Sequence, residues 1–138
     1  MLTTQCLCTQ LRRAARGVTR VYDDALQDIG LTVAQFSLLR HLARLEQPSI
    51  SALAEAMGLD RSTLGRNLRP LQADGLVELL GDADDQRNRL VQLTAQGRER
   101  LERGAQPWEE AQQRMFARLG EDRREQLMAL LGELEALD

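Results

Sequence analysis

Residues 49–76, SISALAEAMGLDRSTLGRNLRPLQADGL, constrain the fold of this chain more than any other stretch. They predict a short helix that ends near Gly58, a tight turn, and another helix over residues 62–73. Asp60 is a typical N-cap for the second of these helices, because its carboxylate can accept hydrogen bonds from free backbone N–H groups, and Gly75 closes that helix. Two short helices joined by a tight turn predict a helix-turn-helix.

A β-hairpin is predicted directly after this motif. The segments LVELL and RLVQLT are short apolar runs on either side of the polar loop GDADDQRN, a pattern typical of two strands and their turn.

Helices are predicted on both sides of these elements. Residues 4–29 predict a helix with one apolar face, followed by Gly30, and Thr32 caps a second helix that ends in the segment EQPS. After the hairpin, residues 95–119 and 121–137 predict two more helices. Pro107 predicts a kink or a break in the first of these two, because proline cannot supply a backbone N–H.

This order of elements predicts a mainly α fold with a small β-hairpin wing: a winged helix-turn-helix framed by helices at both ends. We expect a single unit over residues 1–138, with the winged lobe over residues 31–94. The outer helices, over residues 1–30 and 95–138, carry long leucine stripes that little else in the chain can cover. Each CH₂ left in water forfeits about 0.8 kcal/mol, so burial against a second copy predicts an obligate homodimer through these helices.

Charge and composition limit the function classes. The formal net charge is −3, but residues 1–21 contain four arginines and no acid, and charge concentrated on one face is enough to bind DNA. No signal segment opens the chain and no apolar run approaches the ~18–20 residues of a membrane span, so we expect a cytoplasmic protein without a membrane partner. His41 is the only histidine and has no nucleophile or acid signature beside it, so no enzyme is predicted. Two cysteines and one distant histidine cannot complete a zinc site, and we expect no metal and no cofactor.

Polar side chains fill the first turns of the second helix of the motif, where a recognition helix needs donors that reach base edges in the major groove. Arginine suits guanine and asparagine suits adenine, because each can bond bidentately. Arg69 lies further along the helix and is better placed to reach phosphate. The alternative is a solvated helix face. The residues of this helix expected to contact DNA are Arg61, Ser62, Thr63, Arg66, Asn67 and Arg69.

The combined pattern resembles the MarR family of bacterial transcriptional regulators over essentially the whole chain. SALAEAMGLDRSTLGRNLRPLQADGLVE is similar to the family's helix-turn-helix, and DADDQRNRLVQLTAQG is similar to its wing, with a D-x-R…L-T signature at Asp85, Arg87, Leu93 and Thr94. The tail from GRERLERG onward resembles the family's C-terminal dimerisation helices.

The resemblance implies a homodimer that binds double-stranded DNA at a short inverted repeat, usually represses nearby genes, and is released by a small molecule or by oxidation. It also implies that Asp85 holds Arg87 and that an arginine of the wing, Arg87 or Arg89, enters the minor groove, which attracts arginine electrostatically where it is narrow. The alternative for the wing is a solvated loop whose charges cancel.

The signal that the protein senses stays open between a ligand and thiol chemistry. Family members commonly bind aromatic acids or other small amphiphiles between the dimer helices and the DNA-binding lobe. Candidate residues for such an effector pocket are Tyr22, Phe36, His41 and Trp108, each of which also suits plain core or interface.

The thiol alternative rests on CTQLRRAARGVTRVY, which is similar in register to the first helix of the organic-hydroperoxide sensors, the OhrR branch of the family. Cys8 matches the cysteine of that branch and Tyr22 one tyrosine, whereas a second tyrosine would fall at Arg12. Cys6 and Cys8 would differ by about 200° around a helix axis, so any disulfide is expected between subunits, with Cys8 reacting first and Cys6 as its partner. The further alternatives are two helix cysteines without a redox role, and a winged-helix interaction module that does not bind DNA.

Overall fold

The computed structural model describes residues 5–136, and it confirms the mainly α fold with a β-hairpin wing. Within these residues the chain forms six α-helices, one 3₁₀ turn and a two-stranded antiparallel sheet. In chain order the elements are α1 (Leu7–Ala25), η1 (Gln27–Ile29), α2 (Val33–Leu45), α3 (Ile50–Met57), α4 (Arg61–Ala73), β1 (Val77–Leu80), β2 (Leu90–Leu93), α5 (Ala95–Leu119) and α6 (Glu121–Glu135).

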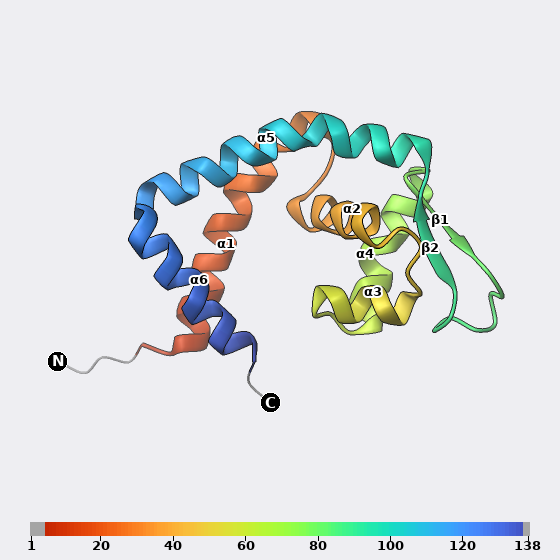
Figure 1. Ribbon diagram of the computed structural model, residues 1–138, viewed down its shortest axis with the longest axis horizontal. Coiled ribbons are helices and arrows are strands. Elements are labelled where there is room, and N and C mark those ends of the chain that lie inside the picture. The colour runs from red at the N-terminus through yellow and green to blue at the C-terminus, as the bar shows by residue number, and fades with distance from the viewer. Residues whose placement is uncertain (1–4, 137–138) are drawn as a thin grey trace.

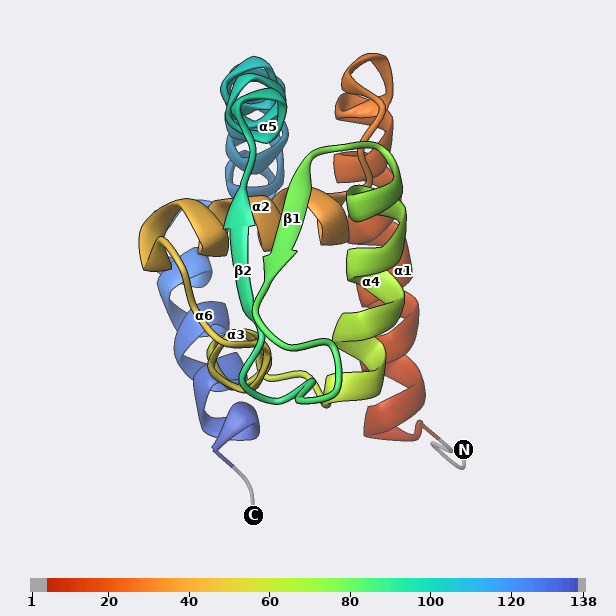
Figure 2. The same ribbon diagram turned by 90° about the vertical axis from the view of Figure 1, so that its right-hand side faces the viewer.

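Two groups of elements lie at opposite ends of the long helix α5. The helices α2, α3 and α4 and the hairpin gather at its N-terminal end, and α1 and α6 lie under its C-terminal half (Figure 1), apart from each other in the turned view of Figure 2. Seen from the hairpin side, α4 and the two strands lie side by side in front of α2 (Figure 2). No helix within residues 5–136 is both long enough and apolar enough to cross a membrane.

The apolar core belongs to the group at the N-terminal end of α5. Leucines of α2, α3 and α4 pack against Leu76, just before β1, and Val91 of β2, and these side chains are almost completely buried. Neither α1 nor α6 contains a buried residue in the described part of the chain. Leu130 of α6, for example, is 57% exposed. The outer helices therefore present apolar side chains that a single copy of the chain leaves uncovered.

Local capping explains where the helices of the core begin. Thr32 forms a capping box with Gln35, and the Ser49 side chain accepts from the N–H of Ala52 at 3.1 Å. Thr94 caps α5, accepting from Gly97 N–H at 3.0 Å. Each cap satisfies a backbone donor that the first turn of a helix leaves free. The cap predicted at Thr32 is thus confirmed.

The first helix differs from the prediction at both ends. It begins at Leu7 with Cys6 as its N-cap, and the predicted start at Thr4 lies outside the described residues. The prediction that it continues to Ile29 is wrong, because the α-helix ends at Ala25 and the chain tightens into η1. Leu26 is fully buried at this point, so core packing turns the chain where the sequence pattern alone would extend the helix.

Of the kink or break predicted at Pro107, the break is wrong, because α5 runs without interruption over its 25 residues from Ala95 to Leu119. The helix is visibly bowed along its length (Figure 1), so the loss of one backbone hydrogen bond is absorbed by curvature. The last helix ends at Glu135, close to the predicted end at Leu137, which lies outside the described residues.

Candidate nucleic-acid interface

The first turn of α4 is organised by Asp60. Its Oδ1 accepts from the N–H of Thr63 at 2.7 Å and from the hydroxyl of Ser62 at 2.8 Å. These hydrogen bonds, with the charge of Arg66 as a smaller contribution, lower the pKa of Asp60 below its ordinary value. The cap predicted at Asp60 is confirmed, and its negative charge is held at the N-terminus of the helix, where the helix dipole favours it.

Helix α4 buries its leucines and leaves most of its polar side chains exposed. Arg61, Ser62, Arg66 and Arg69 are exposed, whereas Thr63 and Asn67 are half-buried. The hydroxyl of Thr63 accepts from Arg66 Nη2 at 3.2 Å, which orients that guanidinium along the helix surface. The structure thus brings the predicted recognition residues onto one helix and directs its arginines to solvent.

The wing is fastened to the beginning of α3 by backbone hydrogen bonds. The N–H of Ile50 donates to the carbonyl oxygen of Arg89 at 2.9 Å, and the N–H of Ser51 donates to that of Arg87 at 3.3 Å. On the same side, Val91 N–H donates to Pro48 O at 2.9 Å. The first free donors of α3 therefore hold the wing in place, so the wing has a fixed position relative to the helix-turn-helix.

Two acidic residues of the wing accept hydrogen bonds from within the loop itself. Asp82 accepts from the backbone N–H of Asp84 at 2.9 Å through its carboxylate. Asp85 Oδ2 accepts from Asn88 Nδ2 at 2.9 Å rather than from Arg87, the partner that the family resemblance implies. Arg87 is exposed. Arg89 is half-buried, and its Nε is buried without a hydrogen-bond partner in the described part of the chain.

A groove of about 510 Å³ separates α4 from the wing. It is lined by Ile50, Arg61, Ser62, Gly65, Arg66, Arg69 and Gln86. Gln86 is the one wing residue in this set, and sequence reasoning missed it. No local pattern marks it, because it reaches α4 only through the backbone contacts between the wing and α3.

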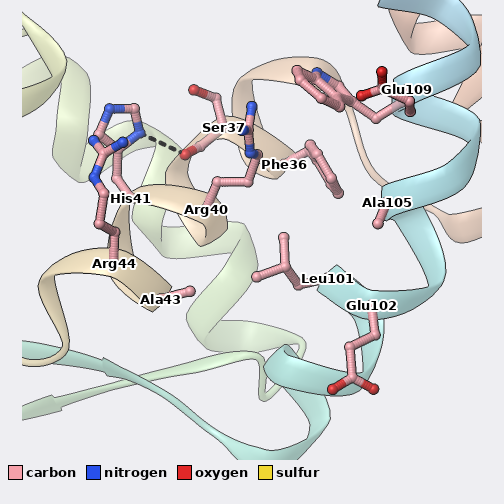
Figure 3. A pocket seen from close by; sticks show the side chains of 11 residues that line it. Phe36, Ser37, Arg40, His41, Ala43, Arg44, Leu101, Glu102, Ala105 and Glu109 are labelled. Atoms are coloured by element: carbon pink, nitrogen blue, oxygen red, sulfur yellow. Dashed lines mark hydrogen bonds between the residues drawn. The ribbon is translucent and has the colours of Figure 1, made fainter.

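A second pocket, of about 630 Å³, lies between α2 and α5 (Figure 3). Three of the four residues predicted for an effector pocket line it, namely Phe36, His41 and Trp108. The rings of Phe36 and Trp108 are stacked with centroids 6.1 Å apart, and the Arg40 guanidinium lies 4.0 Å from the centroid of the Trp108 ring. His41 Nδ1 contacts the carbonyl oxygen of Ser37 at 2.8 Å, as Figure 3 shows.

The fourth predicted residue, Tyr22, lies elsewhere. It borders an apolar groove of about 630 Å³ between α1, α5 and α6, and its hydroxyl donates to Gln112. Partial burial, and then the nearby charge of Glu109, raise the pKa of Tyr22 above its ordinary value. The apolar groove is lined by Ala14, Gly17, Val18, Val21, Tyr22, Gln112, Met115, Phe116, Arg118, Leu119, Leu127, Met128 and Leu131.

Both cysteines are free and exposed at the start of α1. Cys6 is the N-cap rather than a helical residue, so the expectation that both cysteines lie on one helix is wrong. Its sulfur makes no capping hydrogen bond, but the nearby amides of Thr9 and Cys8 and the Thr9 hydroxyl lower the pKa of Cys6. Cys8 and Tyr22 stand fourteen residues apart on one helix, which places them about 21 Å apart along its axis. They do not meet within one chain.

A helix-turn-helix followed by an antiparallel hairpin, with arginines facing the groove between them, defines the class of winged-helix proteins. Within that class, the chain belongs to the MarR family. The MarR family model matches residues 29–88. The transcriptional regulator HosA of Escherichia coli is 31% identical over 127 residues, which cover 91% of each chain.

Two regulators of Bacillus subtilis match shorter segments. The chain spans 64% of the length of one and 62% of the length of the other. The second is the organic hydroperoxide resistance transcriptional regulator, which is 29% identical over 91 residues and 66% of this chain.

Solved structures match nearly the whole chain. The transcriptional regulator MosR of Mycobacterium tuberculosis in complex with DNA is 37% identical, with a TM-score of 0.81 over 94% of this chain and 96% of that one. BpsR of Bordetella bronchiseptica, whose DNA binding is regulated by 6-hydroxynicotinic acid, is 27% identical, with a TM-score of 0.86 over 100% of this chain and 99% of that one.

Proposed function

We propose that this chain is a sequence-specific DNA-binding transcriptional regulator, a repressor that acts as a homodimer on an inverted-repeat operator in the cytoplasm and is released by a small molecule. The observation that carries this proposal is the arrangement of Arg61, Arg66 and Arg69 on an exposed face of α4 beside a wing of fixed position. The DNA complex of MosR, which is similar over 94% of this chain, supports DNA binding by this chain.

The proposed DNA-binding residues are those that the sequence predicts, with one change of role: Asp85 orders the wing loop by accepting from Asn88 and does not hold Arg87. In α4 these are Arg61, Ser62, Thr63, Arg66, Asn67 and Arg69, and in the wing they are Asp85, Arg87 and Arg89. Arg87 is exposed and free of Asp85, so it is available to enter a minor groove. The half-buried Arg89 is better suited to support the base of the wing.

The proposed DNA-binding lobe comprises residues 31–94, and the proposed dimerisation helices comprise residues 1–30 and 95–138. The apolar groove between α1, α5 and α6 supports this division, because a second copy that contributes the same elements would cover it. Leu127 and Met128, which line the groove, are 39% and 54% exposed in one chain. Exposed apolar patches of this kind mark interaction sites.

The pocket between α2 and α5 is the proposed effector site. It joins the DNA-binding lobe to α5, so a ligand that fits only one arrangement of the two would change DNA affinity. Its aromatic wall of Phe36 and Trp108 suits a planar molecule. BpsR, a similar protein regulated by 6-hydroxynicotinic acid, supports an aromatic acid as effector.

A selection experiment tests the proposal. The purified protein is incubated with a pool of random duplexes, and the bound fraction is amplified over several rounds. We expect enrichment of one inverted repeat that is bound by two chains. A pool that stays random would contradict sequence-specific DNA binding and would favour the alternative, a winged-helix interaction module that does not bind DNA. Aromatic acids, including 6-hydroxynicotinic acid, are then titrated while the fluorescence of Trp108, the only tryptophan, is followed. We expect a saturable change in the fluorescence, and release of the duplex at the same concentrations of the acid.

Thiol chemistry is the second candidate signal. The lowered pKa of the exposed Cys6 favours its thiolate, and the similarity to an organic hydroperoxide regulator points to the same class of oxidant. Attack of a thiolate on a hydroperoxide forms an S–O bond, breaks the O–O bond and gives a sulfenic acid and an alkoxide, which takes a proton from water to become the alcohol. The wild type should lose duplex binding when cumene hydroperoxide is added. The variant that keeps its binding, Cys6→Ser or Cys8→Ser, identifies the cysteine that senses the oxidant. Binding that is insensitive to oxidant removes this candidate.

A further inference from the structure

The groove between α4 and the wing is lined by three arginines of α4 and by Gln86 of the wing. We propose that this groove is a channel for one sugar–phosphate strand of the duplex, and that Gln86 binds a phosphate in it. The inference rests on the proposed DNA-binding function and adds to it a phosphate-contacting residue in the wing.

The geometry of a duplex requires a strand at this place. The major and minor grooves of B-DNA are separated by a single sugar–phosphate strand. A protein with α4 in the major groove and the wing in the adjacent minor groove therefore straddles that strand. The groove between α4 and the wing is the space that the two elements leave between them, and backbone contacts with α3 fix its width.

The charges on the walls suit a phosphate strand. Three arginines line the groove, and no carboxylate does. The nearby acids are held elsewhere, since Asp60 caps α4, Asp82 accepts from the Asp84 amide and Asp85 accepts from Asn88. The walls that a ligand in this groove would touch are therefore cationic or neutral.

Gln86 is placed on the wing side of the channel, opposite the arginines. Its Nε2 donates to the carbonyl oxygen of Ala83 at 2.5 Å, which fixes the side chain against its own loop. A glutamine amide has two N–H donors, so one remains for a phosphate oxygen. A neutral donor held in this way positions the strand without adding charge.

Three substitutions at Gln86 test the assignment on the duplex that the wild type selects. Gln86→Lys adds a cation to the channel, so the slope of log K against log[salt] is expected to steepen by about 0.9 per chain, with tighter binding at low salt. Gln86→Glu is expected to weaken binding and flatten the slope. Gln86→Ala is expected to weaken binding to the selected duplex and to a scrambled duplex by the same factor, since phosphates carry no sequence information.

Gln113→Lys is the matched control. Gln113 is an exposed residue of α5, and its replacement by lysine changes the net charge by the same amount as Gln86→Lys. It is expected to leave the slope as in the wild type. A second control uses duplexes with neutral methylphosphonate linkages in the strand between the two grooves. The advantage of Gln86→Lys should vanish on these duplexes.

Two results would overturn the assignment. One is a Gln86→Lys slope equal to that of Gln113→Lys, and the other is a Gln86→Ala loss confined to the selected sequence, which would indicate base reading. Failure of the DNA-binding function itself is a separate outcome, seen when the wild type enriches no duplex.

Discussion

Gly104 of α5 lies directly against the ring of Phe36 in α2: a Cβ added at residue 104 would stand 2.7 Å from Phe36 Cε1. Real Cβ atoms do not approach other atoms so closely, and the Phe36 ring is only 2% exposed, so it cannot move aside freely. The missing side chain of Gly104 thus sets how closely α5 packs on α2.

Gly104→Ala should accordingly destabilise the protein, because overpacking a core costs about 1–3 kcal/mol, more than the roughly 1 kcal/mol that alanine gains over glycine in a helix. Gly97→Ala should be more harmful, since its Cβ would lie 2.1 Å from the carbonyl oxygen of Leu76, which is backbone. Gly132→Ala, with no atom within 4 Å of its added Cβ, is the control and should be neutral or stabilising. Urea unfolding measures all three, and equal stability of Gly104→Ala and Gly132→Ala would contradict the packing argument.

The cap at Asp60 predicts a pH dependence. The pKa of Asp60 is lowered in the folded protein, mainly by the Thr63 amide, so the carboxylate stabilises the fold above its unfolded pKa. This contribution is lost as the pH falls through the folded pKa. The melting temperature of the wild type should exceed that of Asp60→Ala at pH 6–7, and the difference should shrink below about pH 4. A difference that is constant from pH 7 to pH 2.5 would show that the charge of Asp60 contributes nothing.

Replacing Arg66 of α4 and Arg87 of the wing with alanine should affect DNA binding in different ways. Arg66→Ala is expected to relax base specificity, measured as the ratio of affinities for the selected duplex and for single-base variants at matched salt. Arg87→Ala is expected to weaken binding to all duplexes and to flatten the salt dependence. Unchanged affinity for the selected duplex in Arg66→Ala would remove this residue from the interface.

Two leucines of equal exposure distinguish the proposed dimer surface from ordinary surface. Leu127 in the apolar groove and Leu45 at the end of α2 are both 39% exposed. Leu127→Asp should shift the protein from dimer to monomer in sedimentation equilibrium, because it places a charge in a buried interface. Leu45→Asp should leave the dimer intact. Dissociation by both or by neither would show that the groove between α1, α5 and α6 is not the interface.

The thiol of Cys6 should be reactive at unusually low pH. The amides of Thr9 and Cys8 lower its pKa, so the Cys8→Ser variant, which retains only Cys6, should be alkylated by iodoacetamide faster at pH 7 than the same variant unfolded in urea. The pH at half-maximal rate should lie below that of the unfolded protein. Coincident pH profiles would mean that the beginning of α1 does not favour the thiolate. Mass analysis of the oxidised wild type, which has both cysteines, then separates intrachain from intersubunit disulfides.

The sequence predicts those features that depend on neighbouring residues. Thr32 and Asp60 were identifiable as caps because a cap is made within a few positions of the chain. The end of α1 was not identifiable from the sequence, since the burial of Leu26 depends on packing against other elements. Tyr22 was grouped with Trp108 although it faces Gln112 and the apolar groove, because the sequence does not show which side of α5 each residue meets.

Of the candidate DNA-binding site, the sequence likewise predicts the part that depends on neighbouring residues. The arginines of α4 follow from the helix pattern, and their exposure agrees with it. Gln86 could not be found, since it joins them only after Ile50 and Ser51 have fastened the wing to α3. Pro107 is the opposite case: it predicts a kink or a break, and the break does not occur because a long helix packs along its length against α1 and α2.

The uninterrupted α5 places the base of the wing and the apolar groove at the two ends of one rod. With 25 residues it is about 37 Å long. In a homodimer, tilting such a rod by about 5° at the groove moves its other end by roughly 3 Å, close to the rise of one base pair. The distance between half-sites that the protein accepts would then be a mechanical measure of the angle between its subunits, and any molecule that alters this angle changes which operators the protein can span.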